Sequence, residues 1–382
     1  MGNSSGFFAP GDEAKKRVFL DKLEQLGTNV GNATGAKAVK ATDSEPFAAY
    51  RKRARAKYYS SAVAVRLANL KSPLEKSYWK TWRCAGTLEQ KDSTLTASYC
   101  GHRWCTVCNR IRTAQLINGY EKPLSELPDK RFVTLTLPNV PAAELKRTIR
   151  AMITTVQAIQ GKFKKRHQRG HQSWQLVGLR KLECTHNLKT DKYHPHLHFI
   201  ISGTVASKAL IAEWLERVPT ATYKAQDMRK ANAGANKELF KYFSKLVTKQ
   251  DGKNLTVLEP LDVIFQAMKG ERVFQPIGIK KDVSEEIDEI QAQVVEGITP
   301  MHAYWEWDNS DWANGETGEA LTGYLPSPQM DELIANIVTI SGAKGKAAEA
   351  RDIESAKYLP FPASAIERDL RSEERRVGKE CL

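Results

Sequence analysis

Residues 193–202 read YHPHLHFIIS, and this stretch predicts a β-strand that carries a metal site. Side chains two positions apart in a strand point to one face, with their Cα atoms roughly 6.5–7 Å apart. His196 and His198 can therefore converge on one divalent ion, while the residue between them anchors the opposite face in the core. His194 has the same parity, but Pro195 cannot donate to a ladder, so we expect the strand to begin after it. That start makes His194 a neighbour of the site rather than a ligand.

The segment before the histidines predicts the other half of a hairpin. QLVGLRKLEC (175–184) is the predicted strand and NLKTDK (187–192) the predicted turn. Glu183, at the end of the first strand, can then lie beside His198 and supply a carboxylate. Two imidazoles and a carboxylate leave most of an Mg²⁺ or Mn²⁺ shell open to water and phosphate oxygens. A bare His-x-His pair is more often two half-exposed sheet residues; the strand-borne glutamate favours the metal site here.

The flanking segments predict an α+β fold. RFVTLTLPN (131–139) predicts another strand, and helices are predicted from 141 to about 168, from Ala206 to Arg217 and from Asn236 to about Lys249. The expected architecture is a central antiparallel sheet of four or five strands covered by helices. The histidine strand and its Glu183 partner are expected at the centre of that sheet.

The chain divides into five predicted segments. They are an N-terminal extension and linker (1–50), a basic segment with a cysteine module (51–125), the core (126–255), a C-terminal part with an acidic aromatic block (256–325) and a tail (326–382). The aromatic block contains Tyr304, Trp305 and Trp307, with Trp312 nearby. Aromatic side chains this dense more often pack against a main domain than stack on bases.

Four of the six cysteines fall within 25 positions. They are Cys84, Cys100, Cys105 and Cys108, and the last three have the spacing C-x₄-C-x₂-C. Four thiolates can close a tetrahedral structural zinc site, and His102 could replace one of them; free thiols are the alternative. A cluster with two stray cysteines indicates a metal site in a reducing compartment rather than a disulfide framework, which predicts a cytoplasmic protein.

The charge of the chain favours a polyanionic partner. Lys and Arg number 58 against 44 Asp and Glu, and the segment 282–336 holds 13 acids with no Lys or Arg, so the remainder is strongly basic. Nucleic acid is the leading candidate, ahead of lipid. The candidate DNA contacts are Arg103, Arg110, Lys164, Lys165 and Arg166, although solvation of a helix surface explains the arginines equally well. No run of about 18 apolar residues and no secretory pattern is present, so we expect no membrane partner.

Several motifs together resemble the HUH endonucleases, and more narrowly the plasmid rolling-circle replication initiators. HPHLH (194–198) follows a strand that ends in a glutamate, FVTLTLPN (132–139) resembles the first motif block, and CGHRWCTVC (100–108) resembles a cysteine stretch of that family. The resemblance covers roughly residues 80 to 325. It implies an HUH fold and a catalytic ion held by Glu183, His196 and His198.

The same resemblance implies a nucleophilic tyrosine on a downstream helix, and KELFKYFSKL (237–246) supplies Tyr242. Glu238 and Lys245 lie four residues before and three after it, on the same helical face. A phenol loses its proton near pH 10, so tyrosine is an attainable nucleophile and a competent leaving group. Lys245 would add positive charge beside the phosphate, and Glu238 would activate water in a terminating step. An ordinary amphipathic helix with a packed tyrosine is the alternative.

The implied function is to initiate rolling-circle replication of a plasmid. The protein would nick single-stranded origin DNA by metal-assisted transesterification, leave a 5′-phosphotyrosine and a free 3′-hydroxyl, and later rejoin the strand. The implied partners are origin DNA and the host helicase and polymerase. The alternatives are a relaxase or transposase with the same chemistry, and a non-enzymatic zinc regulator that binds DNA. The basic charge argues against a metal-dependent hydrolase of small molecules.

Overall fold

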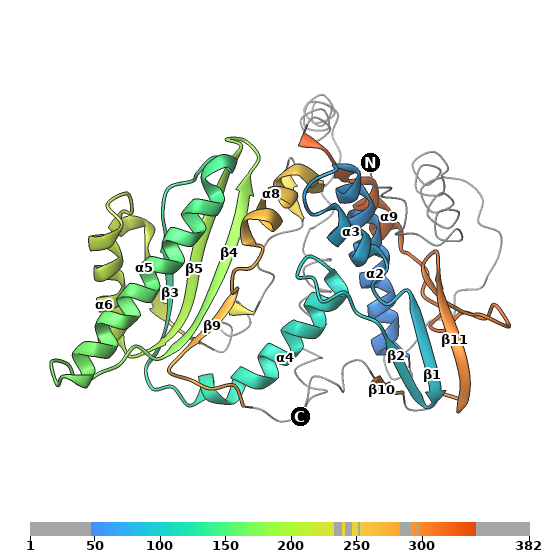
Figure 1. Cartoon of the computed structure of the whole chain (residues 1–382), viewed down its shortest axis with the longest axis horizontal. Helices are drawn as coiled ribbons and strands as arrows, with labels where there is room; N and C mark the ends of the chain where they lie inside the picture. The colour runs from blue at the N-terminus through green and yellow to red at the C-terminus, as the bar shows by residue number, and fades with distance from the viewer. Residues whose placement is uncertain are drawn as a thin grey trace, which may run out of the picture.

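The structure is a computed structural model that describes residues 47–232, 239–240, 247–250, 253–282, 292–295 and 298–340. These residues form two five-stranded sheets and a sheet of three strands, with helices between and around them (Figure 1). None of the described helices is both long enough and apolar enough to cross a membrane.

The sheet that carries the two histidines, called the histidine sheet below, is antiparallel and has the order β6-β3-β5-β4-β9. Its strands are β3 (Lys130–Thr136), β4 (Gly178–Asn187), β5 (Lys192–Ser202), β6 (Asp227–Lys230) and β9 (Phe274–Ile277). The histidine strand β5 is central and β4 is its neighbour. The prediction of an antiparallel sheet centred on the histidine strand is therefore confirmed.

Alternation along β5 gives the histidine sheet two different faces. Leu197, Phe199 and Ile201 are fully buried beneath α5 (Ala142–Gln168) and α6 (Thr204–Arg217). The opposite face, called the site face below, carries the histidines and Ile200. Ile200 packs in a smaller cluster with Tyr120 of α4 (Thr106–Ser125). Figure 1 shows α5 and α6 on one side of the sheet and α4 on the other.

The strand β5 begins at Lys192, earlier than predicted, so Pro195 lies inside it. Tyr193 exchanges two backbone hydrogen bonds with Val140, on the β3 side of β5. Pro195, two residues later, turns its nitrogen to that same side, and β3 has already ended at Thr136. The missing N–H therefore breaks no ladder, and the strand passes through the proline. His194 consequently belongs to the strand and shares the site face.

Two other predicted boundaries are also wrong. β4 continues past Cys184 to Asn187, so Glu183 lies within the strand rather than at its end. The helix predicted to reach Lys249 does not, because Thr248–Gln250 form β7, antiparallel to β8 (Lys253–Val257). A β-branched threonine opens β7, and the paired neighbour satisfies its backbone.

The predicted tyrosine helix is described only in part. Leu239 and Phe240 lie within the described residues. The predicted catalytic residues Glu238, Tyr242 and Lys245 lie outside them.

A second sheet, which the sequence analysis did not predict, has the order β10-β2-β1-β11-β12. Its strands are β1 (Thr87–Asp92), β2 (Thr94–Ala97), β10 (Ala292–Val294), β11 (Met301–Asp308) and β12 (Asp311–Asn314). Trp305 and Trp312 are 6% and 1% exposed, and the indole N–H of Trp312 donates to the carbonyl of Ala85. The predicted packing role of the aromatic block is confirmed for these two tryptophans, while Tyr304 is 51% exposed.

Helices between the two large sheets build the shared core. α2 (Ala48–Asn69) is buried along most of its length and contacts α3 (Glu75–Trp82), α4 and α8 (Leu258–Met268). α8 also packs against α5 and β4, so it reaches the histidine sheet. The remaining elements are the short helix η1 (Tyr223–Ala225), α9 (Pro328–Ala335) and β13 (Ile337–Val338), which pairs parallel with β8.

Candidate metal centre and its surroundings

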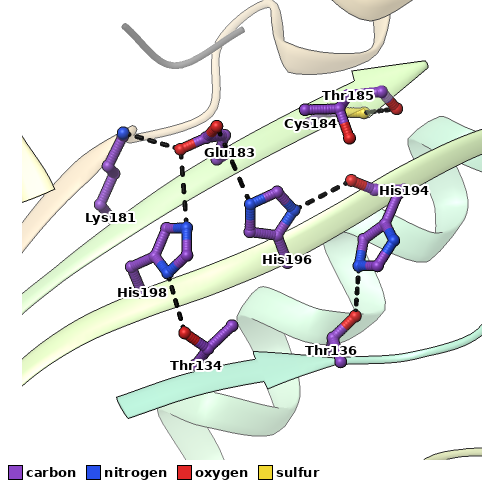
Figure 2. A network of polar contacts seen from close by, with 9 residues as sticks. All are labelled: Thr134, Thr136, Lys181, Glu183, Cys184, Thr185, His194, His196 and His198. Carbon is purple, nitrogen blue, oxygen red and sulfur yellow. Dashed lines mark hydrogen bonds and ion pairs between the residues drawn. The ribbon is translucent and has the colours of Figure 1, made fainter. Parts of the chain in front are cut away.

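Cross-strand pairing brings one carboxylate and two imidazoles together on the site face. Glu183 on β4 lies directly opposite His196 on β5, and the neighbouring pair is Lys181 with His198. One oxygen of Glu183 is 3.9 Å from Nε2 of His196, and the other is 3.6 Å from Nε2 of His198 (Figure 2). One ligand atom from each of the three residues lies within 4.8 Å of the others, a spacing that a single ion can bridge. The structure therefore brings the three predicted ligands together.

Hydrogen bonds to Nδ1 fix the orientation of both imidazoles. Nδ1 of His198 lies 3.1 Å from Oγ1 of Thr134, and Nδ1 of His196 lies 3.1 Å from the carbonyl oxygen of His194. A carbonyl only accepts, so Nδ1 of His196 carries the proton and Nε2 keeps its lone pair for a metal. His194 is held in turn by a hydrogen bond between its Nε2 and Oγ1 of Thr136 (Figure 2). Partners of this kind orient metal-binding histidines.

A buried lysine holds the carboxylate. Nζ of Lys181 lies 2.8 Å from Oε2 of Glu183, and the lysine side chain is fully buried. Burial alone would raise the pKa of Glu183, but the charge and hydrogen bond of Lys181, together with the two histidines, outweigh it and hold that pKa below its usual value. Glu183 is therefore ionised, which is the form that a metal requires.

Burial favours the neutral form of His198 and His194. It lowers the pKa of His198 to about 3, assisted by charge at His196 and opposed by Glu183. Burial and His196 also lower the pKa of His194. A neutral imidazole at His198, the Nε2 atom of His196 and an ionised carboxylate form a donor set that suits a divalent ion such as Mn²⁺ or Mg²⁺.

Two residues of the predicted tyrosine helix pack on the site face. Leu239 and Phe240 are 0% and 3% exposed, and they share a cluster with Ile200 and Phe132. Ile200 lies two positions after His198 on the same face of β5. The chain just before the predicted nucleophile is therefore held close to the candidate metal centre.

The four predicted zinc ligands also converge. Sγ of Cys108 lies 3.4 Å from Sγ of Cys84 and 3.6 Å from Sγ of Cys100, and all four sulfur atoms, including that of Cys105, lie within 4.8 Å of one another. A tetrahedral site with zinc–sulfur bonds of about 2.3 Å has sulfur–sulfur edges of about 3.8 Å. Three of the cysteines are buried and Cys100 is half-buried. The cluster thus has the composition and size to hold a metal ion.

A buried cation accompanies the cysteine cluster. Lys57 of α2 is 2% exposed, and its Nζ donates to the carbonyl oxygens of Cys84, at 2.6 Å, and Trp82, at 3.2 Å. Burial lowers the pKa of Lys57 to about 8, against the opposite effect of the four cysteines. Hydrogen bonds from neighbouring thiols lower the pKa of Cys100. The positive charge at Lys57 offsets the negative charge that thiolates would place in this part of the core.

The loop between Cys100 and Cys105 joins the cysteine cluster to the rest of the core. The Trp104 ring stacks on Phe265 of α8, with centroids 5.4 Å apart. Arg103 donates a hydrogen bond to the carbonyl oxygen of Glu271, in the turn that leads to β9. Arg103, a predicted DNA contact, is thus already engaged by the protein itself.

Three of the other predicted DNA contacts lie on the opposite side of the histidine sheet from the candidate metal centre. Arg110 is half-buried on α4. Lys164, Lys165 and Arg166 are exposed near the end of α5, and that helix covers the face of the histidine sheet opposite the site face (Figure 1). The structure does not bring these three side chains to the histidines.

Sequence reasoning missed the residues that support the candidate metal centre. Thr134 and Thr136 alternate along FVTLTLPN, and Lys181 precedes Glu183 by two positions, so strand parity could have placed all three on the site face. Arg229 of β6 was also missed. Its Cζ lies 4.6 Å from the centroid of the Phe132 ring, and no sequence signal identified its strand.

Comparisons with known proteins assign the chain to a family. The family model described as "Replication protein" matches residues 92–301, which include the histidine sheet and three of the four clustered cysteines, Cys84 lying before the match. "Protein rep" of Streptococcus pneumoniae serotype 2 is 31% identical over 134 residues, or 31% of this chain and 39% of the relative. "Protein rep" of Staphylococcus aureus is 31% identical over 122 residues, or 30% of this chain and 50% of the relative. The matches thus span half or less of the length of these curated relatives, and no solved structure matches the chain. Because the family model covers more than half of its residues, the chain belongs to the replication protein family.

Proposed function

We propose that this chain is a single-tyrosine HUH endonuclease that nicks and rejoins single-stranded DNA at a plasmid origin. The observation that carries the proposal is the convergence of Glu183, His196 and His198 on one face of an antiparallel sheet, in a chain of the replication protein family. These three residues would hold Mg²⁺ or Mn²⁺. A bound divalent ion polarises the scissile phosphate and spreads the charge that develops on its oxygens.

The residues around the three ligands prepare them for this task. Lys181 keeps Glu183 ionised and fixes one of its oxygens. Thr134 holds His198 so that Nε2 faces the carboxylate. Because these partners are already in place, little reorganisation is needed when a metal and a phosphate bind.

The proposed nucleophile is Tyr242. Its phenolic oxygen attacks the phosphorus, the bond from phosphorus to the 3′ oxygen breaks, and the departing oxygen takes up a proton to become a free 3′-hydroxyl. The new bond is a 5′-phosphotyrosine, and the reverse reaction rejoins the strand. The buried position of Phe240 supports this assignment, because the two residues from Phe240 to Tyr242 span at most about 7 Å.

Two further residues have proposed roles in the same segment. Lys245 would place a positive charge beside the phosphate in the transition state. Glu238 would accept a proton from water in a hydrolytic step that ends the cycle, in place of the transesterification to a second tyrosine that ends it in some relatives. Both assignments rest on their helical spacing from Tyr242.

We propose a structural role for the cysteine cluster. Zn²⁺ held by Cys84, Cys100, Cys105 and Cys108 would leave no open position for substrate. It would fix the loop that carries Arg103 and Trp104 against α8 and the turn before β9. Reduced cysteines suit the cytoplasm, where we place the protein.

The proposed partners follow from the chemistry. Origin DNA is the substrate, and the free 3′-hydroxyl is a primer for the host polymerase once a host helicase separates the strands. The net charge of +14 supports binding to DNA. A relaxase or transposase would use the same nick, whereas a zinc regulator that only binds DNA would form no covalent product.

The decisive experiment is a denaturing gel of the protein incubated with origin-strand oligonucleotides and Mn²⁺. We expect a covalent protein–DNA band that disappears with chelator and in Tyr242→Phe. Tyr304→Phe, which alters an exposed tyrosine on the second sheet, is the matched control and should keep the band. DNA retained in a native gel without any covalent band would favour the binding-only regulator.

A further inference from the structure

We propose that the segment from Tyr223 to Lys230, at the edge of the histidine sheet, is the track that holds single-stranded DNA beside the candidate metal centre. This inference rests on the proposed function and extends it by naming the surface that guides the strand. The segment comprises the short helix η1 (Tyr223–Ala225) and the edge strand β6.

The register of β6 places Arg229 on the site face. Arg229 pairs with Phe132 across the β3–β6 ladder, and Phe132 in turn pairs with Ile200, two positions from His198. Directly opposed residues share a face, so Arg229 lies on the same surface as the histidines. Its guanidinium stacks on the ring of Phe132, and that ring lies 5.3 Å from the imidazole of His198. The ring of Phe132 thus lies between the guanidinium of Arg229 and the imidazole of His198.

Arg229 is accessible from solvent. Its side chain is 49% exposed, and its ion pair with Asp227 is loose, at 3.7 Å between half-exposed groups. Such pairs contribute little in water and are easily exchanged for another anion. A guanidinium can stack on an aromatic ring through its face and bond a phosphate through the N–H donors at its edge.

Hydrogen bonds from Gln226 hold the N-terminal end of the segment beside β3. The side-chain amide of Gln226 accepts from the backbone N–H of Thr136 at 2.9 Å and donates to its carbonyl oxygen at 3.3 Å. This pairing continues the ladder beyond β6 and holds η1 next to the end of β3. Tyr223, in η1, is 77% exposed, the most exposed of the large apolar side chains that the structure describes. An exposed aromatic ring on a fixed turn is a platform for an unpaired base.

The two side chains therefore have separable tasks. Arg229 would neutralise one phosphate, and Tyr223 would stack on one base. Loss of one phosphate contact reduces the slope of log affinity against log salt by about 0.7 for single strands, whereas loss of stacking weakens binding without changing that slope. Charged side chains on an edge strand also prevent sheets from pairing, and a purely protective Arg229 would alter self-association but not the salt slope.

The test is fluorescence anisotropy of a labelled oligothymidylate of about 15 nucleotides, titrated with the full chain between about 50 and 200 mM salt. We expect Arg229→Gln to reduce the salt slope by about 0.7 and Tyr223→Ala to weaken binding about fivefold or more at an unchanged slope. Lys208→Gln and Val205→Ala, exposed positions on α6 beneath the opposite face, are the matched controls and should change neither quantity. Melting temperature and Mn²⁺ affinity should be unchanged in Tyr223→Ala, Lys208→Gln and Val205→Ala.

The inference is overturned if Arg229→Gln keeps the wild-type slope, or if Lys208→Gln reduces it equally. Both results are independent of catalysis. A wild-type protein that forms no covalent band would refute the proposed nuclease, while the anisotropy titration would still decide whether the edge segment binds single strands.

Discussion

The hydrogen bond from His198 to Thr134 provides a quantitative test of the candidate metal centre. Thr134→Val keeps the shape of the side chain but removes the oxygen that lies 3.1 Å from Nδ1. One such bond contributes about 0.5–1.5 kcal/mol net, and loss of an outer partner of a metal-binding histidine typically costs 10–100-fold in affinity. The two ranges meet near tenfold, which is about 1.4 kcal/mol. We therefore expect Thr134→Val to bind Mn²⁺ about tenfold more weakly than the wild type.

The matched control for this variant lies on the same strand. Thr136 also contacts a histidine, but its partner His194 is not one of the three proposed ligands. Isothermal titration of Mn²⁺ should show little change in Thr136→Val. Equal losses in both variants would refute the reasoning, because they would indicate a general disturbance of β3. Unchanged affinity in Thr134→Val would show that His198 needs no orienting partner or does not bind the ion.

The remaining predictions concern pH, zinc and Arg103. In metal-free protein, burial lowers the pKa of His198 from about 6.5 in the unfolded chain to about 3, so the free energy of unfolding should fall as pH drops between these values. Urea titrations of His198→Gln should show a slope with pH that is smaller by up to about 1.4 kcal/mol per pH unit. Cys108→Ser should lose bound zinc and melt at a lower temperature. The control Cys184→Ala alters a buried cysteine outside the cluster and should keep its zinc. Equal zinc content in the two variants would contradict the proposed ligand set. Arg103→Gln should lower the free energy of unfolding by about 1.5–3 kcal/mol, because the hydrogen bond to the carbonyl oxygen of Glu271 is lost. The salt dependence of DNA binding should be unchanged in this variant. A smaller slope of log affinity against log salt would indicate instead that Arg103 contacts a DNA phosphate.

Local sequence patterns predicted the histidine sheet well. The period-two alternation around His196 and the short turn before it fix both the hairpin and its exposed face, because the paired strands are adjacent in the chain. The convergence of Glu183 with the histidines follows from that register. The predicted start of β5 was wrong at Pro195 because a missing N–H weakens a strand only where a neighbouring strand would accept its hydrogen bond. The neighbour on that side of β5 is β3, which ends at Thr136 and does not reach the position opposite Pro195.

The second sheet could not be predicted in the same way. Its strands β1 and β11 are far apart in the chain, and the hydrogen bond from Trp305 to Gln90 spans 215 residues. No periodicity within either segment specifies such a partner. The burial of Lys181 could not be predicted from the sequence either, because lysine side chains usually lie in solvent. The roles of Tyr242, Glu238 and Lys245, and the five segment boundaries, stay predictions.

The central claim is that Tyr242 becomes covalently joined to DNA at this site. The most direct measurement is mass spectrometry of the trapped protein–DNA product after the DNA is digested to its terminal nucleotide and the protein is cut into peptides. We predict one modified peptide, from residues around 237–249, with the nucleotide 5′-phosphate on Tyr242 and none when chelator is present. A nucleotide on another tyrosine, or no modified peptide from a reaction in which the strand is cut, would contradict the account.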